Sequence, residues 1–235
     1  MINKVYEYYF KMDKTIIFRS ILSGIFIGLG CIFMLVVKSD ILLPKSISSL
    51  LSGLVFCIGL FLVLCFTSNL FTGSCINFKH VLSNKMSLLD FAKLLATNYI
   101  FNFVGIALIA YCASRIGFQG LATSIAYTKF SKPLDVLFIQ GFLCNILVCL
   151  SVFLHIKNRS GWMNTLLSAM LSVIFTITMF VACGFEHSIA DMFFVFFVDY
   201  SILSFGQVLF TLLFISFANL IGGLFIATLF HHADL

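Results

Sequence analysis

Three ionisable side chains stand close together inside an otherwise apolar stretch, "FVACGFEHSIADMFF" at residues 180–194. Glu186 and His187 are adjacent, and Asp191 follows His187 by four positions. Ionisable groups are costly inside a membrane, so residues of this kind are candidates for function. Burial favours the neutral form of an isolated histidine, and a neutral imidazole still donates a hydrogen bond and exchanges a proton near neutral pH. We therefore expect His187 to carry the chemistry of this stretch.

The two acidic residues have simpler explanations. Beside a helix break, Glu186 would accept hydrogen bonds from freed backbone N–H groups and brace the chain. Asp191 would share a helix face with His187 if a helix begins there, but a contact with a polar rim or a neighbouring subunit explains it equally well. We predict a bracing role for Glu186 and leave Asp191 open.

The composition around this stretch indicates a membrane protein that crosses the bilayer several times. Of the 235 residues, 61% are hydrophobic and 10% are charged, and the mean hydropathy is +1.13. A soluble globule needs more polar surface than this. Uncharged runs of about the 20 residues that cross a bilayer cover 20–37, 46–78, 94–114, 136–156, 160–185 and 200–230. Because they are apolar on all sides rather than alternating, they predict an all-α protein with six spans and not a β-barrel.

Two stretches are too long for one crossing, and they lie in matching places. Residues 46–78 stay apolar, as do residues 163–198 apart from the three ionisable side chains. Each holds a cluster of small and polar residues, "TSNLFTGS" in the first and "ACGFEHS" in the second. We expect the helix to be interrupted at each cluster, with Gly73 and Gly184 at the breaks.

The order of spans then repeats once within a single membrane domain, residues 1–235. The halves are about 15–115 and 130–231, each with an interrupted middle span. Three spans per half place the halves in opposite orientations, a plan in which broken helices expose backbone groups at mid-membrane. A rival layout treats each cluster as a turn between two complete spans, giving eight. Neither cluster has the basic flanks of an exposed loop, which favours six.

Basic residues give the orientation. With a cytoplasmic N-terminus, nine of the 14 lysines and arginines fall on inside segments, and the positive-inside rule favours that choice. The inside set is Lys4, Lys11, Lys14, Arg19, Lys79, Lys85, Lys93, Lys157 and Arg159; the outside set is Lys38, Lys45, Arg115, Lys129 and Lys132. They form no patch that would bind nucleic acid. The sequence predicts a multi-pass protein of the cell membrane with both termini in the cytoplasm.

Neither a metal nor an organic cofactor is expected. The eight cysteines lie within or beside apolar runs without a C-x-x-C spacing, which is typical of reduced residues in a helix core. An enzyme using Glu186 and His187 for acid–base work is the alternative from another class. The sequence offers it neither a Gly-rich phosphate loop nor a metal-ligand constellation, and adjacent side chains diverge on a regular helix.

Five stretches, in order along the whole chain, resemble the formate/nitrite transporter family. They are "GLFLVLCFTSNLFTGSC" (59–75), "NYIFNFVGIAL" (98–108), "QGFLCNILVCLSVF" (140–153), "MFVACGFEHSIADMFF" (179–194) and "ANLIGG" (218–223). The resemblance implies a homopentamer of six-helix, aquaporin-like protomers. Each would have its own pore for small monovalent anions such as formate, nitrite, hydrosulfide or lactate. A pore for water or glycerol shares this architecture, but its Asn-Pro-Ala loops are missing from the sequence.

The resemblance also implies roles for single residues. His187 corresponds to the central pore histidine and Thr72 to the threonine facing it, although from the residues alone Thr72 would bond back to the preceding turn. Asn219 corresponds to a pore asparagine of the last span. Lys129 corresponds to a vestibule lysine that attracts anions, although Lys132 could serve instead. The apolar residues implied at constrictions are Phe56, Leu60, Leu70 and Phe180.

Two residues depart from the family pattern. Asn69 stands where the family usually has an acidic residue, and Asp191 where it usually has asparagine. A bare anion crossing an apolar constriction would lose its hydration at high cost, so we expect the solute to take a proton near His187 and Thr72 and cross as a neutral acid.

Overall fold

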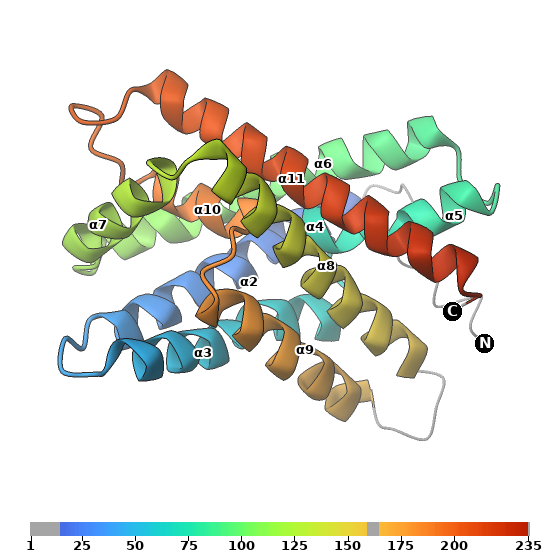
Figure 1. Ribbon diagram of the computed structural model, residues 1–235, viewed down its shortest axis with the longest axis horizontal. Helices are drawn as coiled ribbons and strands as arrows, with labels where there is room; N and C mark the ends of the chain where they lie inside the picture. Colours follow the sequence, from blue (N-terminus) through green and yellow to red (C-terminus); the bar gives the residue numbers. More distant parts are fainter. Residues whose placement is uncertain (1–14, 159–164, 235) are drawn as a thin grey trace.

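The structure, a computed structural model, describes residues 15–158 and 165–234, and every regular element in these ranges is helical (Figure 1). The long helices are α2 (Thr15–Lys38), α3 (Lys45–Cys65), α6 (Leu88–Arg115), α8 (Leu134–Asn158), α9 (Thr165–Ala182) and α11 (Phe205–His232). The short ones are α4 (Phe71–Ser74), the 3-10 turn η1 (Cys75–Asn77), α5 (Phe78–Leu82), α7 (Gln119–Phe130) and α10 (Ser188–Val195). Four of the nine basic residues that predict the orientation lie outside the described residues: Lys4, Lys11, Lys14 and Arg159.

Five of the described helices, α2, α3, α6, α8 and α11, have the length and composition of membrane spans. Helix α9 adds a shorter apolar stretch, Met170–Ala182. Many large apolar side chains on the outer faces are exposed, among them Phe18 at 69% and Phe175 at 74%. In lipid such side chains lie in a matching solvent, whereas in water they would drive association. The fold is that of a multi-pass membrane protein.

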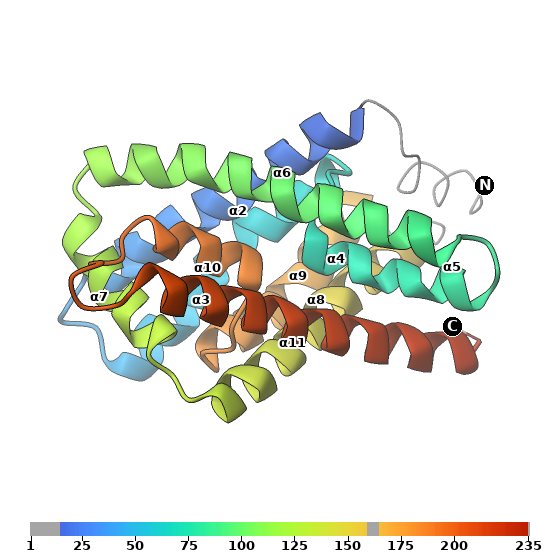
Figure 2. The same cartoon turned by 90° about the horizontal axis from the view of Figure 1, so that it is seen from above.

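Helices α6 and α11 are built alike. Each has 28 residues and begins after a serine whose hydroxyl accepts from the backbone N–H three residues on, Ser87 in one and Ser204 in the other. This is the common way to satisfy a helix N-terminus. In Figures 1 and 2 the two helices run the length of the molecule.

Each of these two helices packs closely on the helix that opens its half of the chain, α6 on α2 and α11 on α8. Glycine allows the close approach. A Cβ on Gly105 would lie 2.1 Å from the carbonyl oxygen of Ile21, and one on Gly222 would lie 2.2 Å from that of Phe142. Neither position has room for a side chain, as at many helix crossings in membranes. Helix α3 lies between α2 and α9 and joins the two halves.

The first break follows α3, which ends at Cys65. Thr67 takes a left-handed backbone with φ 49°, and helix resumes in α4. Gly73 was expected at this break, but the structure places it inside α4. There a Cβ would come 3.1 Å from Cγ2 of Val152, so the small residue serves packing against α8. The turn that interrupts the helix lies earlier, at a threonine.

The second break separates α9 from α10, and Figure 1 shows it as an open connection between them. Gly184 has φ 70°, as expected of a glycine at a break. His187 is extended, with φ −114° and ψ 107°, and forms the N-cap of α10. Helix α10 has 8 residues, and α4 with η1 and α5, which continue it without a gap, ends at Leu82, so neither segment crosses a membrane alone. The eight-span layout is therefore wrong.

Candidate functional site

Thr72 and His187 meet between the two breaks. Oγ1 of Thr72, in the first turn of α4, lies 2.8 Å from Nε2 of His187, and both side chains are buried. The residues are separated by 115 positions, so only the fold brings them together. The pairing implied by the family resemblance is thus present in the structure as a hydrogen bond.

The hydrogen bonds around His187 assign its tautomer. Nδ1 accepts from the backbone N–H of Ala190 at 3.1 Å, so in a neutral ring the proton is on Nε2. Nε2 then donates to the hydroxyl of Thr72, whose own proton is left for another acceptor. Thr72 itself is fully buried and lines none of the three cavities of the described structure, whereas His187 lines two of them.

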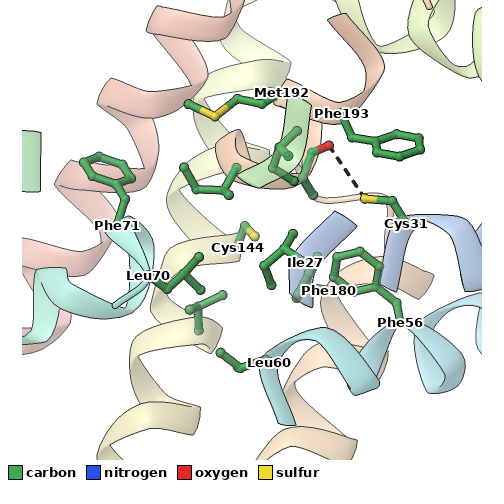
Figure 3. Packing of buried hydrophobic residues seen from close by; sticks show 14 of the residues in the cluster. Ile27, Cys31, Phe56, Leu60, Leu70, Phe71, Cys144, Phe180, Met192 and Phe193 are labelled. Atoms are coloured by element: carbon green, nitrogen blue, oxygen red, sulfur yellow. Dashed lines mark hydrogen bonds between the residues drawn. The ribbon is translucent and has the colours of Figure 1, made fainter. Parts of the chain in front are cut away.

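Four apolar side chains surround this pair. The rings of Phe56 and Phe180 meet edge to face, with centroids 5.8 Å apart, and Phe180 also stacks on the His187 ring at 5.8 Å. Leu60 and Leu70 are buried nearby. Figure 3 shows Phe56 and Leu60 of α3, Leu70 of the first break and Phe180 of α9 converging on one region. All four residues expected at constrictions lie together.

Three cavities lie in series around these side chains. The outer cavity, of about 250 Å³, is lined in part by Phe56, Phe180 and His187. The middle one, of about 10 Å³, shares these three and adds Leu60 and Leu70. The inner one, of about 30 Å³, shares Leu70 and follows the first break. The shared residues therefore separate each cavity from the next: Phe56, Phe180 and His187 between the outer and middle cavities, and Leu70 between the middle and inner ones.

Two lysines and two carboxylates line the outer cavity and pair with one another. Nζ of Lys129 donates to Oε2 of Glu186 and, at 2.7 Å, to Oδ1 of Asp191. Nζ of Lys132 lies 2.6 Å from Oε1 of Glu186. We call these four residues the outer cluster. Their charges balance, so neither lysine faces the cavity as an unpaired cation.

Glu186 braces the second break, although through different partners from those expected. The backbone N–H groups of the break were expected to donate to its carboxylate, but both oxygens accept from lysine ammonium groups. An ammonium is the stronger partner for a buried carboxylate. Glu186 thereby ties the break to α7 and to the turn that follows it.

Asp191 is completely buried and only half satisfied. Oδ1 accepts from Lys129, whereas Oδ2 has no hydrogen-bond partner among the described residues. The position one turn after His187 is as expected for a helix that begins there. The carboxyl lines the outer cavity.

Lys38 is a further cation of the outer cavity. It lies in the last turn of α2 and lines the cavity together with the outer cluster. Within the described parts of the chain it takes part in no ion pair. From the sequence it was one of several outside lysines, and no pattern there marks it, because its place at the cavity depends on how α2 packs.

Asn219 occupies a different place from the one implied by the resemblance. It is fully buried and does not line any of the three cavities of the described structure. Its amide Nδ2 donates to the carbonyl oxygens of Glu186 and Gly141, and its Oδ1 accepts from the N–H of Ser188. Asn219 therefore holds the backbone on both sides of His187 and ties it to α8.

Asn102 holds the first break in the same way and was missed from the sequence. Nδ2 donates to the carbonyl oxygens of Asn69 and Ser20, and Oδ1 accepts from the N–H of Phe71. A signal was there to find: each asparagine follows its capping serine at the same distance, and a crossing glycine, Gly105 or Gly222, follows three residues later.

The inner cavity is lined mostly by apolar residues, and its polar lining residues are uncharged. Ser68, Asn69, Ser74 and Asn77 are among its lining residues. Oδ1 of Asn69 has no hydrogen-bond partner among the described residues, and the side chain is almost completely buried. The two ends of the series therefore differ in charge.

Comparison with known proteins gives this arrangement a family. The profile of the Formate/nitrite transporter family matches residues 4–233. A probable formate transporter of Methanothermobacter thermautotrophicus is 31% identical over 205 residues, which are 77% of this chain and 73% of that protein. The nitrite transporter NirC of Salmonella typhimurium is 31% identical over 180 residues, or 74% of this chain and 64% of that protein. The chain belongs to the formate/nitrite transporter family.

Solved structures agree over nearly the full length. An FNT family ion channel matches with a TM-score of 0.86 at 26% identity and covers 99% of this chain and 98% of its own. A pentameric formate channel with formate bound matches with a TM-score of 0.77, also at 26% identity, over 94% of this chain and 96% of its own. These relatives are described as transporters and channels, and none of them as an enzyme.

Proposed function

We propose that the chain forms a membrane channel for small monovalent anions of weak acids, such as formate, nitrite or hydrosulfide, and passes each anion together with a proton. The observation that carries the proposal is the series of three cavities, which narrows to apolar side chains where Thr72 and His187 meet. Family membership and the formate-bound structural relative support it.

The protonation step follows from the constriction. A dry passage between Phe56, Phe180, Leu60 and Leu70 imposes a desolvation cost on a charged solute far above that on a neutral acid. In the proposed mechanism the anion collects in the outer cavity and receives a proton that comes, directly or through water, from the region of His187. It crosses as the neutral acid and ionises on the far side.

We further propose that the two halves, about residues 15–115 and 130–231 of one membrane domain, are inverted repeats of three spans each. The interrupted spans would be the second and fifth, in an aquaporin-like protomer. Asn102 and Gly105 in the first half match Asn219 and Gly222 in the second. Each residue contacts the same kind of neighbour in its own half as its counterpart does in the other, which supports the repeat. Broken helices that face each other across a repeat axis are a frequent design for transport sites.

The proposal extends to assembly and placement. The protomer would assemble as a homopentamer in the cell membrane, with its outer face against lipid and both termini in the cytoplasm. The pentameric relative and the many exposed apolar side chains support it. Each protomer would hold a complete pore, since the three cavities lie within a single chain.

Purified protein in liposomes tests the function. We expect uptake of formate, nitrite, hydrosulfide or lactate that speeds up as the outside is acidified and that acidifies the lumen without a matching electrical current. A pH-independent flux accompanied by full anionic current would contradict the protonation mechanism. Glycerol serves as the control solute, and swelling in glycerol equal to that in formate would indicate a neutral-solute pore instead.

A further inference from the structure

We propose that Asp191 sets the charge of the outer cavity by taking up a proton, so that the anion is attracted more strongly when the carboxyl is protonated. The inference deepens the proposed function and rests on it. It concerns the one residue of the outer cluster that has a carboxylate oxygen without a hydrogen-bond partner among the described residues.

The hydrogen bonds distinguish the two acids of the cluster. Glu186 has an ammonium group on each oxygen, from Lys129 and from Lys132. Asp191 has one, shared with Glu186, and its Oδ2 lacks a partner among the described residues. A buried carboxylate oxygen without a donor is strongly disfavoured, and protonation removes the penalty by converting that oxygen to a hydroxyl. A proton arriving from the outer cavity therefore goes to Asp191 before Glu186.

The other groups facing Asp191 do not compete for this proton. The side chains within electrostatic range on the neighbouring helices are Cys31 of α2, Tyr99 of α6 and Cys144 of α8. These are neutral in apolar surroundings, so they have no negative charge to lose. His187 uses Nδ1 as an acceptor for Ala190, Lys129 and Lys132 donate to the carboxylates of the cluster, and Lys38 is a further cation of the cavity.

The charge of the cluster then follows the state of one carboxyl. With Asp191 ionised, two lysines and two carboxylates cancel. With Asp191 protonated, the cluster carries one net positive charge at the wall of a cavity that ends on Phe56, Phe180 and His187. A positive charge in a low-dielectric cleft raises the local concentration of anions. Anion entry and proton uptake at the outer side are thereby linked.

Four proteins test the inference: the wild type, Asp191→Asn, Lys132→Gln and the double variant. Uptake of formate into liposomes is measured against formate concentration at about pH 5.5 and about pH 8. For the wild type we expect the apparent KM to be about tenfold higher at the alkaline pH, the size of effect that one nearby charge produces. Asp191→Asn should have the low KM at both pH values.

The remaining variants test whether the KM depends on the net charge of the outer cluster rather than on the shape of the side chain at position 191. Lys132→Gln should raise the KM above the wild-type value at the alkaline pH. The double variant should be pH-independent and lie near the wild type at the alkaline pH, since its cluster is again neutral. Asp135→Asn, at an exposed aspartate in the first turn of α8, is the matched control and should behave as the wild type.

The outcomes separate the two proposals. A wild type that takes up none of formate, nitrite and hydrosulfide at either pH overturns the proposed function. If the wild type takes up formate and the KM of Asp191→Asn changes between the two pH values as much as the wild-type KM does, only the role of Asp191 is overturned. If Asp191→Asn fails to assemble, the pH dependence of Lys132→Gln decides, because its KM must still fall on acidification if Asp191 is the group that titrates.

Discussion

The two helix breaks are held alike by their backbones and differ in their side chains. At each break an asparagine from the last helix of the same half, Asn102 or Asn219, binds two carbonyl oxygens and one N–H. Around the second break, however, Glu186 and Asp191 bind lysines beside a cavity of about 250 Å³. The first break has uncharged groups beside a cavity of about 30 Å³. The asparagine contacts are common to both breaks, whereas the paired lysines and carboxylates of the outer cluster surround the second break.

The largest effect on stability should come from removing the asparagine side chains that hold the two breaks. Asn102→Leu and Asn219→Leu each remove three hydrogen bonds to backbone groups in a region that water cannot reach. The expected loss is about 3–6 kcal/mol in the free energy of unfolding. The measurement is the thermal midpoint of purified protein in detergent, followed by size-exclusion chromatography.

A matched control lies on the same helix. Asn98 is equally buried, but its amide bonds only the side chains of Ser20 and Ser74. Asn98→Leu should therefore cost clearly less than Asn102→Leu. If Asn102→Leu were tolerated while Asn219→Leu was not, the breaks would not be braced alike and the comparison would fail.

The next effect concerns the contact between the breaks. In His187→Asn the new side chain is still a good N-cap for α10, but it is too short to reach the hydroxyl of Thr72. We expect stability to change little and anion uptake to fall about tenfold or more, because a donor is lost where the solute must be neutralised. Liposome uptake measures the flux, and the thermal midpoint shows whether the cap survives.

Thr72→Val supplies the partner measurement. Valine keeps the shape of threonine and removes only the hydroxyl, so the imidazole N–H remains but has no fixed acceptor. We expect a smaller loss of flux than in His187→Asn, and a double variant no worse than His187→Asn alone. Losses that simply multiply would mean that the two side chains act independently, against the hydrogen bond of 2.8 Å.

A smaller effect should come from Lys38, which adds a cation to the lining of the outer cavity, whereas no lysine or arginine is among the described residues that line the inner cavity. Lys38→Gln should raise the apparent KM for anions entering from the outer cavity by about threefold to tenfold at low ionic strength, and by less at high salt. Arg115→Gln, at an exposed residue that does not line the cavity, is the control. An unchanged KM, or a change that salt does not reduce, would remove Lys38 from anion attraction.

Composition and local pattern in the sequence predict some features of the fold directly. The all-helical fold follows from uncharged apolar runs, and the turn at Gly184 from a glycine in a polar cluster. The pairing of Thr72 with His187 came only from the resemblance, because nothing local links residues so far apart. The ion pairs of the outer cluster were not predicted, because Lys129, Lys132 and Asp191 come together only when α7 packs beside α10. Asn102 was missed because a buried asparagine within an apolar run resembles any polar residue of a helix.

The smallest effect distinguishes how the two breaks turn. Gly184 has φ 70°, and a Cβ there would have open space, so Gly184→Ala should lose only the strain of a left-handed residue, about 1–2 kcal/mol. Thr67 already bears that strain at φ 49°. In Thr67→Gly the relief is offset by the greater flexibility of glycine in the unfolded chain, so we expect a change below about 1 kcal/mol. The thermal midpoints of Gly184→Ala and Thr67→Gly measure the two changes in stability. Equal losses of stability would mean that backbone strain does not control these turns. The contacts of Asn102 and Asn219 would then determine where the helices break.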